Sequence, residues 1–507
     1  MNIKDKKERI SDVMAIYIVR PTEENFKLIK SDLQKHNFDN FYINFVEKCD
    51  DSVLKNFYSD LIQTDNYNRI YKITINPIGI FLVHPSVFSL NVPSPYLFLN
   101  NPNSKENEIN SYFENVGTGI FNALFTLKSI PIIKYRTGWF AENIINIIQQ
   151  NFKQTFDKFP ELLEEFPKKN NTLLVILDRD TDLPVMLNHA ASLGSMYNDV
   201  FGIMRSKVTN STKFEIDPLT DHIWNNFMST NFAVVEEKIH DESIAIRDKL
   251  KFLDEGKNTS DDIEKMSEKL STTIEELRDL KMKQTVLSYH ASFLTKLSNE
   301  LGNRRIAQFY ELEELMLNKR TITKEIKQKF YDLITLKSIQ IQDINESRYD
   351  ILRICLIYYL IHTKITNDEI KEIERALNNI GQNLDSFDYL KQKRSFEESM
   401  KKGKTVQDSG FLSKSFSFVV NRLGSLMSIE QPSIVADLLS SLASNKEVSN
   451  FVTCHTLKKG VEKLNYNFNQ VIVFMVGGGS LTEFEYIDNL LKKIEIGVRI
   501  YNNNINI

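Results

Sequence analysis

The chain has 507 residues, 42% of them hydrophobic, which is too long for one core and sufficient to fill two or three domains. Its 63 lysines and arginines are balanced by 67 aspartates and glutamates, and this formal net charge of -4 excludes nucleic acid as a partner attracted by overall charge. The three cysteines lie far apart without a C-x-x-C pair, which argues against a disulfide framework or a zinc site and favours a reducing, cytosolic compartment.

The first half of the chain alternates between strand and helix patterns. The start, MNIKDKKERISDVMAIYIV, has no continuous apolar stretch or cleavage site and so is not a signal peptide. Thr22 then follows Pro21 as a helix N-cap before apolar residues at helical spacing. Strands are predicted at 15–19, 41–46, 78–83, 130–135 and 173–178, with helices at 52–63, 108–128 and 138–158. This alternation predicts parallel sheets covered by helices.

The segment from about 217 to 398 is highly charged, helical in period and almost without strand patterns, which predicts a separate all-α domain. Leucines recur every seven residues at 280, 287, 294 and 301, and a second row runs through Ile263, Leu270 and Leu277. The rows indicate either bundle packing or a protruding helical hairpin that offers its seam to partner helices. The longest candidate membrane span, at 351–361, contains Arg353 and is about half the ~20 residues a bilayer requires, so we expect a soluble or peripheral protein.

A polar, basic stretch at 400–410 leads into an amphipathic segment that extends to 428. Its apolar face is formed by Leu412, Phe416, Val419, Leu423 and Leu426. Such a segment is typical of a core element, a mobile lid or an interfacial membrane helix. We expect a movable element that covers the helical domain or contacts a membrane surface.

The end of the chain returns to the α/β pattern, with a buried strand, a glycine turn and a helix in NQVIVFMVGGGSLTEFEYIDNLL. The helical domain is therefore predicted to be inserted into an α/β domain. We place an abbreviated N-terminal α/β domain at 1–75, a central α/β domain at 76–216 and 465–507, and the helical domain at 217–464.

Three acids close the strand at 173–178, and they raise the question of catalysis. Asp178, Asp180 and Asp182 come close to the nucleophile loop of dehalogenase-type phosphatases, which bind Mg²⁺ at a strand end. That chemistry also requires a second acidic pair on another strand, and the sequence does not supply one. The other interpretation is architectural, with Asp178 capping or Arg179 forming a salt bridge at the sheet edge.

The turn at Gly477, Gly478 and Gly479 also has two interpretations. Its backbone N–H groups could hold a phosphate at a helix N-terminus, although the P-loop Lys-Ser/Thr and the G-x-G-x-x-G spacing are both missing. It could instead be a tight turn in which Ser480 or Thr482 caps the helix. The alternative function is thus an α/β nucleotide- or phosphate-binding enzyme that uses Asp178, Asp180 and these glycines.

Five segments, in order, resemble one family. They are IYIVRPTEENFKLIKSDL, LLVILDRDTDLPVMLNHAASLGSMYNDVF, FYELEELML, ALNNIGQNLDSFDYLKQKRSF and VIVFMVGGGSLTEFEYI. Together they resemble the SM (Sec/Munc-like) family of cytosolic syntaxin-binding chaperones, and most closely its Sly-type branch in ER–Golgi traffic. The resemblance implies an arch of three domains without catalytic activity or cofactor. It further implies binding of a syntaxin-type SNARE and the assembling SNARE bundle, which promotes vesicle docking and fusion.

The chain departs from the family pattern at both ends. Only about fourteen residues precede the P-T-x-x-N region, and VRIYNNNINI ends where a final strand would be followed by a helix. We therefore expect a shortened first sheet. The protein is expected to be cytoplasmic and peripheral at ER and Golgi membranes.

Within the first domain we predict a groove for the syntaxin's N-terminal peptide. Its lining is Leu54, Phe57, Tyr58, Ile70 and Ile73. The first three are spaced i, i+3, i+4 and the last two i, i+3, so two short amphipathic pieces can present an apolar cleft. Ordinary helix-to-sheet packing gives the same spacing. The resemblance favours the groove, because in Sly-type proteins the matching positions receive an apolar side chain of the peptide.

Overall fold

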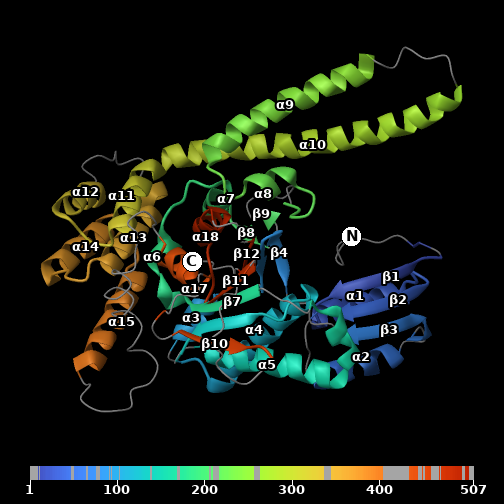
Figure 1. Cartoon of the computed structure of the whole chain (residues 1–507), viewed down its shortest axis with the longest axis horizontal. Coiled ribbons are helices and arrows are strands. Elements are labelled where there is room, and N and C mark those ends of the chain that lie inside the picture. Colours follow the sequence, from blue (N-terminus) through green and yellow to red (C-terminus); the bar gives the residue numbers. More distant parts are fainter. Residues whose placement is uncertain are drawn as a thin grey trace.

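The computed structural model describes residues 9–501 apart from several gaps. The gaps are 11, 47–50, 64–66, 76–79, 91, 93, 102, 138–139, 168–171, 205–206, 209–215, 256–262, 336–343, 403–432, 444–447, 449–450, 458–467, 469 and 494–496. Along the described chain the fold has an N-terminal α/β unit, a central α/β unit and a large helical part from which a hairpin projects (Figure 1). No helix in these described ranges is long and apolar enough to span a membrane.

The N-terminal unit is a small parallel sheet with helices packed on one face. Its strands are β1 (Met14–Val19), β2 (Asn40–Phe45) and β3 (Ile70–Ile75), in the order β1-β2-β3. The helices are α1 (Glu23–Gln34), α2 (Asp51–Ile62) and the 3₁₀ helix η1 (Tyr67–Arg69). The Thr22 side chain accepts a hydrogen bond from the Asn25 N–H, which confirms the predicted N-cap, and Phe26, Ile29 and Leu33 face the sheet.

The central sheet has seven strands in the order β10-β6-β7-β11-β12-β5-β4. They are β4 (Phe81–His84), β5 (Val87–Ser89), β6 (Ile132–Arg136), β7 (Thr172–Asp178), β10 (Phe451–His455), β11 (Gln470–Val476) and β12 (Gly497–Tyr501). The five inner strands are parallel, whereas the edge strands β4 and β10 pair antiparallel to their neighbours. β10 lies inside the range 217–464 that we assigned to the helical domain, so the chain re-enters the central sheet before residue 465.

Side chains of β7 and β11 alternate between two hydrophobic cores, as the period of a strand requires. On one face they pack against α3 (Pro95–Asn100), α4 (Glu106–Thr126) and α5 (Ala141–Lys158). On the other face lie α7 (Leu193–Phe201), α17 (Ile434–Ala443) and α18 (Leu481–Lys493). Every residue of β7 is buried, which agrees with its continuous apolar sequence. Short elements complete this unit: η2 (Pro160–Glu165), η3 (Arg179–Thr181), α6 (Pro184–Leu187), β8 (Ile203–Met204) and β9 (Lys207–Val208).

The helical part contains α8 (His222–Phe227), α9 (Phe232–Glu255), α10 (Ile263–Asn303), α11 (Ile306–Lys319), α12 (Lys324–Ile334), α13 (Ile344–Ile361), α14 (Asn367–Asn379) and α15 (Asp385–Lys402). Helices α9 and α10 lie side by side and extend away from the rest of the molecule (Figure 1). Leu287 and Leu294 of the heptad row are buried at the base of this hairpin, near Trp224 and Val235. Both features that the rows indicated are therefore present. The hairpin protrudes, and the buried leucines of the row pack at its base. The predicted fold class, α/β with a large inserted all-α part in an arch, is confirmed.

Candidate functional site

The acidic end of β7 is built around a buried ion pair. Arg179 is 1% exposed and its guanidinium donates to both carboxylate oxygens of Glu483 at 2.6 Å, while Glu483 is 3% exposed. The same guanidinium donates to the backbone oxygens of Gly478 and Asp182. Arg179 therefore joins the end of β7 to the turn before α18.

Asp180 and Asp182, which follow the strand, connect the central unit to the helical part. Asp182 accepts two hydrogen bonds from Arg320, the C-cap residue of α11, at 3.1 Å, and a third from the Ile434 N–H at 2.9 Å. Asp180 accepts from Lys393 of α15 and from the Tyr96 hydroxyl of α3. These partners occupy the carboxylates, so the two acids serve as anchors between domains.

Asp178, like Asp182, is buried away from bulk water. Burial, followed by the nearby charge of Asp180, raises the pKa of Asp178 well above its ordinary value. A catalytic nucleophile or Mg²⁺ ligand would have to be ionised and accessible, and Asp178 is neither well solvated nor exposed. Among the residues that the structure describes, no group of three His, Cys, Asp or Glu side chains could hold a metal ion.

The glycine turn after β11 is shaped by its contact with Arg179. Gly477 and Gly478 both adopt positive φ, at 94° and 99°. A Cβ on Gly477 would lie 2.9 Å from the Cβ of Arg179, so only glycine fits there. Ser480 and Glu483 then cap α18 reciprocally, with Glu483 N–H donating to Ser480 Oγ and Ser480 N–H to Glu483 Oε2. This geometry supports the tight-turn interpretation of the glycines.

Asp180→Asn is therefore expected to leave no enzymatic activity to lose. We expect neither the wild-type chain nor the variant to hydrolyse p-nitrophenyl phosphate in the presence of Mg²⁺, because Lys393 and Arg320 pair with Asp180 and Asp182 and Asp178 is buried. The measurement is a colorimetric assay with a known phosphatase as positive control. A Mg²⁺-dependent activity that disappears in the variant would contradict this prediction.

The residues of the predicted groove lie together in the N-terminal unit, but at different depths. Leu54 and Phe57 are buried in its core, where the Phe57 ring stacks on Phe26 at 4.2 Å between centroids. Tyr58 is 37% exposed, and Ile70 and Ile73 are partly buried on β3. The accessible part of the set is thus Tyr58 with the two isoleucines, and the other two residues support it from behind.

The amphipathic segment predicted at 400–428 lies almost wholly outside the described residues. This applies to Leu412, Phe416, Val419, Leu423 and Leu426. The hairpin, by contrast, is described over much of its length. It exposes the apolar side chains of Val234, Ile244, Met282 and Tyr289 to solvent.

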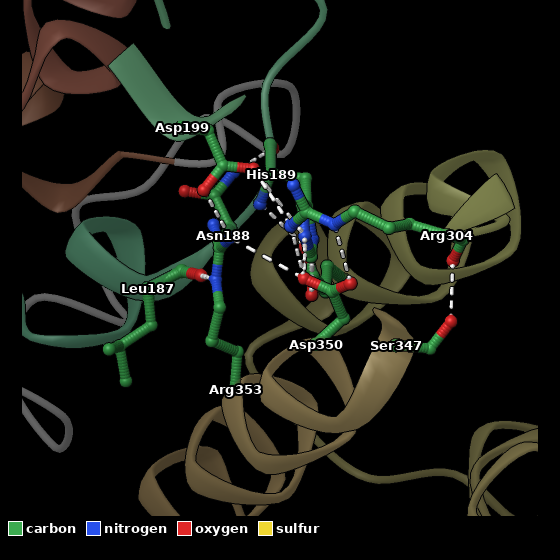
Figure 2. Close-up of polar contacts among 9 residues, drawn as sticks. Leu187, Asn188, His189, Asp199, Arg304, Ser347, Asp350 and Arg353 are labelled. Atoms are coloured by element: carbon green, nitrogen blue, oxygen red, sulfur yellow. Dashed lines mark hydrogen bonds and ion pairs between the residues drawn. The ribbon is translucent and has the colours of Figure 1, made fainter. Parts of the chain in front are cut away.

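A polar cluster that sequence reasoning missed lies where the central unit meets the helical part (Figure 2). This junction cluster consists of His189, Asp199, Arg304, Glu313, Asp350 and Arg353. The His189 ring places Nδ1 3.0 Å from Glu313 and Nε2 3.0 Å from Asp350. The charged residues between 348 and 353 are a local sequence signal for this cluster. The rest of it could not be predicted, because its members come from segments up to 164 residues apart.

Arginines complete the junction cluster and fix its geometry. Arg304 Nε donates to Asp350 at 2.9 Å, and Arg304 Nη2 donates to Asp199 at 3.2 Å. Arg353 Nη1 donates to Asp199 at 2.6 Å and its Nε to the Leu187 carbonyl at 2.7 Å. Burial alone would lower the pKa of His189, but the Glu313 and Asp350 carboxylates outweigh it and raise this pKa above its ordinary value.

The sequence matches one protein family along nearly its whole length. The model described as the Sec1 family matches residues 1–503. The chain is 26% identical over 411 residues to the protein sly1 of Schizosaccharomyces pombe, covering 78% of this chain and 62% of that protein, less than two thirds of its length. It is 24% identical over 555 residues to SLY1 of Saccharomyces cerevisiae, covering 95% of this chain and 80% of that protein.

Solved structures share the fold over nearly the whole chain. Sly1p in complex with an N-terminal peptide of Sed5p matches with a TM-score of 0.72 and 19% identity, over 99% of this chain and 84% of that one. The SM protein Vps45 in complex with the Qa SNARE Tlg2 matches with a TM-score of 0.67 and 17% identity, over 99% and 86%.

Proposed function

The chain belongs to the Sec1 family of SM proteins, and from this premise we propose that it binds a syntaxin-type SNARE and promotes SNARE complex assembly for vesicle docking and fusion. The proposed setting is ER–Golgi transport, with the protein cytoplasmic and peripheral at these membranes. The observation that carries the proposal is the family match over residues 1–503, together with the fold shared with Sly1p bound to a Sed5p peptide. The protein acts without catalysis or cofactor.

The acidic strand end supports this function over the phosphate-binding enzyme. Asp180 and Asp182 hold the helical part against the central sheet, and Arg179 fills the space beside the glycine turn. The hairpin of α9 and α10, with its exposed apolar residues, offers a surface to partner helices. A pull-down with the cytosolic segment of a syntaxin, beside calorimetry with nucleotides and Mg²⁺, tests the two functions directly. Nucleotide binding without syntaxin binding would overturn the proposal.

The proposed docking site for the syntaxin's N-terminal peptide is the surface at Tyr58, Ile70 and Ile73, supported from below by Leu54 and Phe57. Tyr58 offers an exposed aromatic side chain and β3 two partly buried β-branched residues, and the core of the unit contains the stacked rings of Phe26 and Phe57. A short peptide gains most of its affinity from one or two apolar anchors buried in such a surface. The segment 400–428 is proposed to be a movable element whose apolar face covers the helical domain or contacts a membrane surface, on the evidence of its sequence.

Ile70→Glu is expected to weaken binding of a syntaxin N-terminal peptide at least tenfold, or ~2 kcal/mol, because a charge would face the apolar anchor. Fluorescence titration with a labelled peptide measures this. Leu54→Lys is unsuitable for the same purpose, because it would place a charge in the core of the unit.

Ile18→Glu is the matched control for this experiment. Ile18 lies on β1, at the opposite edge of the same sheet, and is exposed. This variant should bind the peptide as the wild type does. If the wild type, Ile70→Glu and Ile18→Glu bind the peptide with equal affinity and give the same circular dichroism spectrum, the surface at Tyr58, Ile70 and Ile73 is not the docking site.

A further inference from the structure

The edge strand β1 of the N-terminal sheet exposes apolar side chains to solvent. In the order β1-β2-β3 it pairs with β2 over its full length, and no other strand in the described part of the chain pairs with it. Every second side chain points away from the buried core, and Ile16 is 67% exposed and Ile18 63% exposed. Met14 belongs to the same exposed row. A row of apolar side chains at a sheet edge marks a surface for a partner.

The backbone of the same three residues points to the free edge of the sheet. The carbonyls of Val13 and Val19 accept hydrogen bonds from the N–H groups of Asp39 and Val46, which flank β2, at 3.3 and 3.0 Å. The odd-numbered residues of β1 therefore direct their backbone groups toward β2. Because this direction alternates along a strand, the even-numbered residues direct their N–H and C=O groups outward. The edge offers both hydrogen-bonding groups and apolar side chains.

The two edges of this sheet differ in charge. The edge strand β3 carries Lys72, which is exposed, and a lysine on an edge strand discourages pairing with another strand. The sequence of β1, MAIYIV, contains neither a charged residue nor a proline. Of the two edges, β1 is therefore the one open to a further strand.

The strand β1 is complementary to itself in one antiparallel register. With a two-fold axis at Ile16, this residue faces its counterpart, and Met14 faces Ile18 of the second copy, so that all three outward residues form hydrogen-bonded pairs. The same register sets Asp12, just before the strand, opposite Arg20, just after it. Opposite charges then meet at both ends of the pair. Moving the axis by one residue would set Ile18 opposite Asp12, or Met14 opposite Arg20, and lose this match.

We propose that two copies of this chain associate through β1, antiparallel, so that their N-terminal sheets form one continuous sheet. A second copy is the occupant that the observations favour, because the strand matches itself in side chains, backbone groups and flanking charges. The interface lies at the edge opposite to β3, which carries part of the surface proposed for the syntaxin peptide. Association therefore leaves that surface open, and the dimer does not depend on syntaxin binding.

Analytical ultracentrifugation of the full chain over a range of concentrations tests the dimer. We expect a monomer–dimer equilibrium in the wild type and at least about tenfold weaker association in Ile16→Lys, because two lysines would face each other across the axis. Tyr71→Lys is the matched control. It places the same charge at an exposed position of β3 and should dimerise as the wild type does. A wild type that is monomeric at every concentration, or undiminished association in Ile16→Lys, would overturn the proposal.

The register is tested by chemical cross-linking, which does not rely on the lysine variant. Ile16→Cys and Ile18→Cys introduce thiols at two neighbouring positions of the same exposed row, and the native cysteines are present in both. Across the proposed axis the thiols at 16 face each other, whereas those at 18 are offset by about 13 Å along the strands. A short bis-thiosulfonate reagent should therefore link Ile16→Cys into a covalent dimer far more efficiently than Ile18→Cys. Equal linking of the two variants, or more in Ile18→Cys, would overturn the register.

Discussion

Arg179→Met is expected to lower the free energy of unfolding by about 3–5 kcal/mol. The change leaves the Glu483 carboxylate buried without the guanidinium that donates to both of its oxygens at 2.6 Å. It also leaves the carbonyls of Gly478 and Asp182 without this donor. Urea denaturation followed by circular dichroism measures the loss.

Two controls separate the buried pair from a general effect of losing an arginine. Arg247→Met removes an exposed arginine of α9 and should change stability by no more than about 0.5 kcal/mol. Adding Glu483→Leu to Arg179→Met removes the stranded charge and should restore part of the loss, because a buried pair replaced by apolar residues is often neutral. A loss below about 1 kcal/mol in the single variant would show that Glu483 is solvated or paired otherwise.

The sequence predicts those elements whose determinants are local. The continuous apolar run at 173–178 gives the buried strand β7, and Thr22 gives the start of α1. β10 was not predicted, because its residues are only partly buried and its strand conformation depends on pairing with β6, more than 300 residues away in sequence. Tertiary pairing, which a local pattern does not contain, decides such an element.

The same distinction applies to the site. The missing second acidic pair argued against catalysis at Asp178 and Asp180, and the Ser480 cap could be anticipated from its spacing to Glu483. Glu483 as the partner of Arg179 could not, because the two are 304 residues apart. At the groove, the i, i+3, i+4 spacing of Leu54, Phe57 and Tyr58 predicts that the three side chains share one face of a helix. The spacing does not predict which of these side chains the sheet buries.

His189→Ala is expected to lower the free energy of unfolding by about 3–5 kcal/mol at pH 6, since it leaves Glu313 and Asp350, both fully buried, without the imidazolium between them. Arg304 still pairs with Asp350, so Glu313 carries most of the effect. The measurement is again urea denaturation. His240→Ala, on the exposed face of α9, is the matched control and should be nearly neutral.

The pH dependence of this difference identifies the charge of His189 as its cause. The pKa of His189 is raised in the folded state, so its stabilising contribution is complete below the unfolded pKa of about 6.5 and is lost as pH rises through the folded pKa. Deprotonation removes the donor to one carboxylate, so that Asp199, Glu313 and Asp350 are left facing two arginines. The advantage of the wild type over His189→Ala should therefore be largest near pH 6 and shrink in alkaline solution. An advantage that grows with pH would mean that the ring is neutral in the native state, and that the two carboxylates are held by other donors.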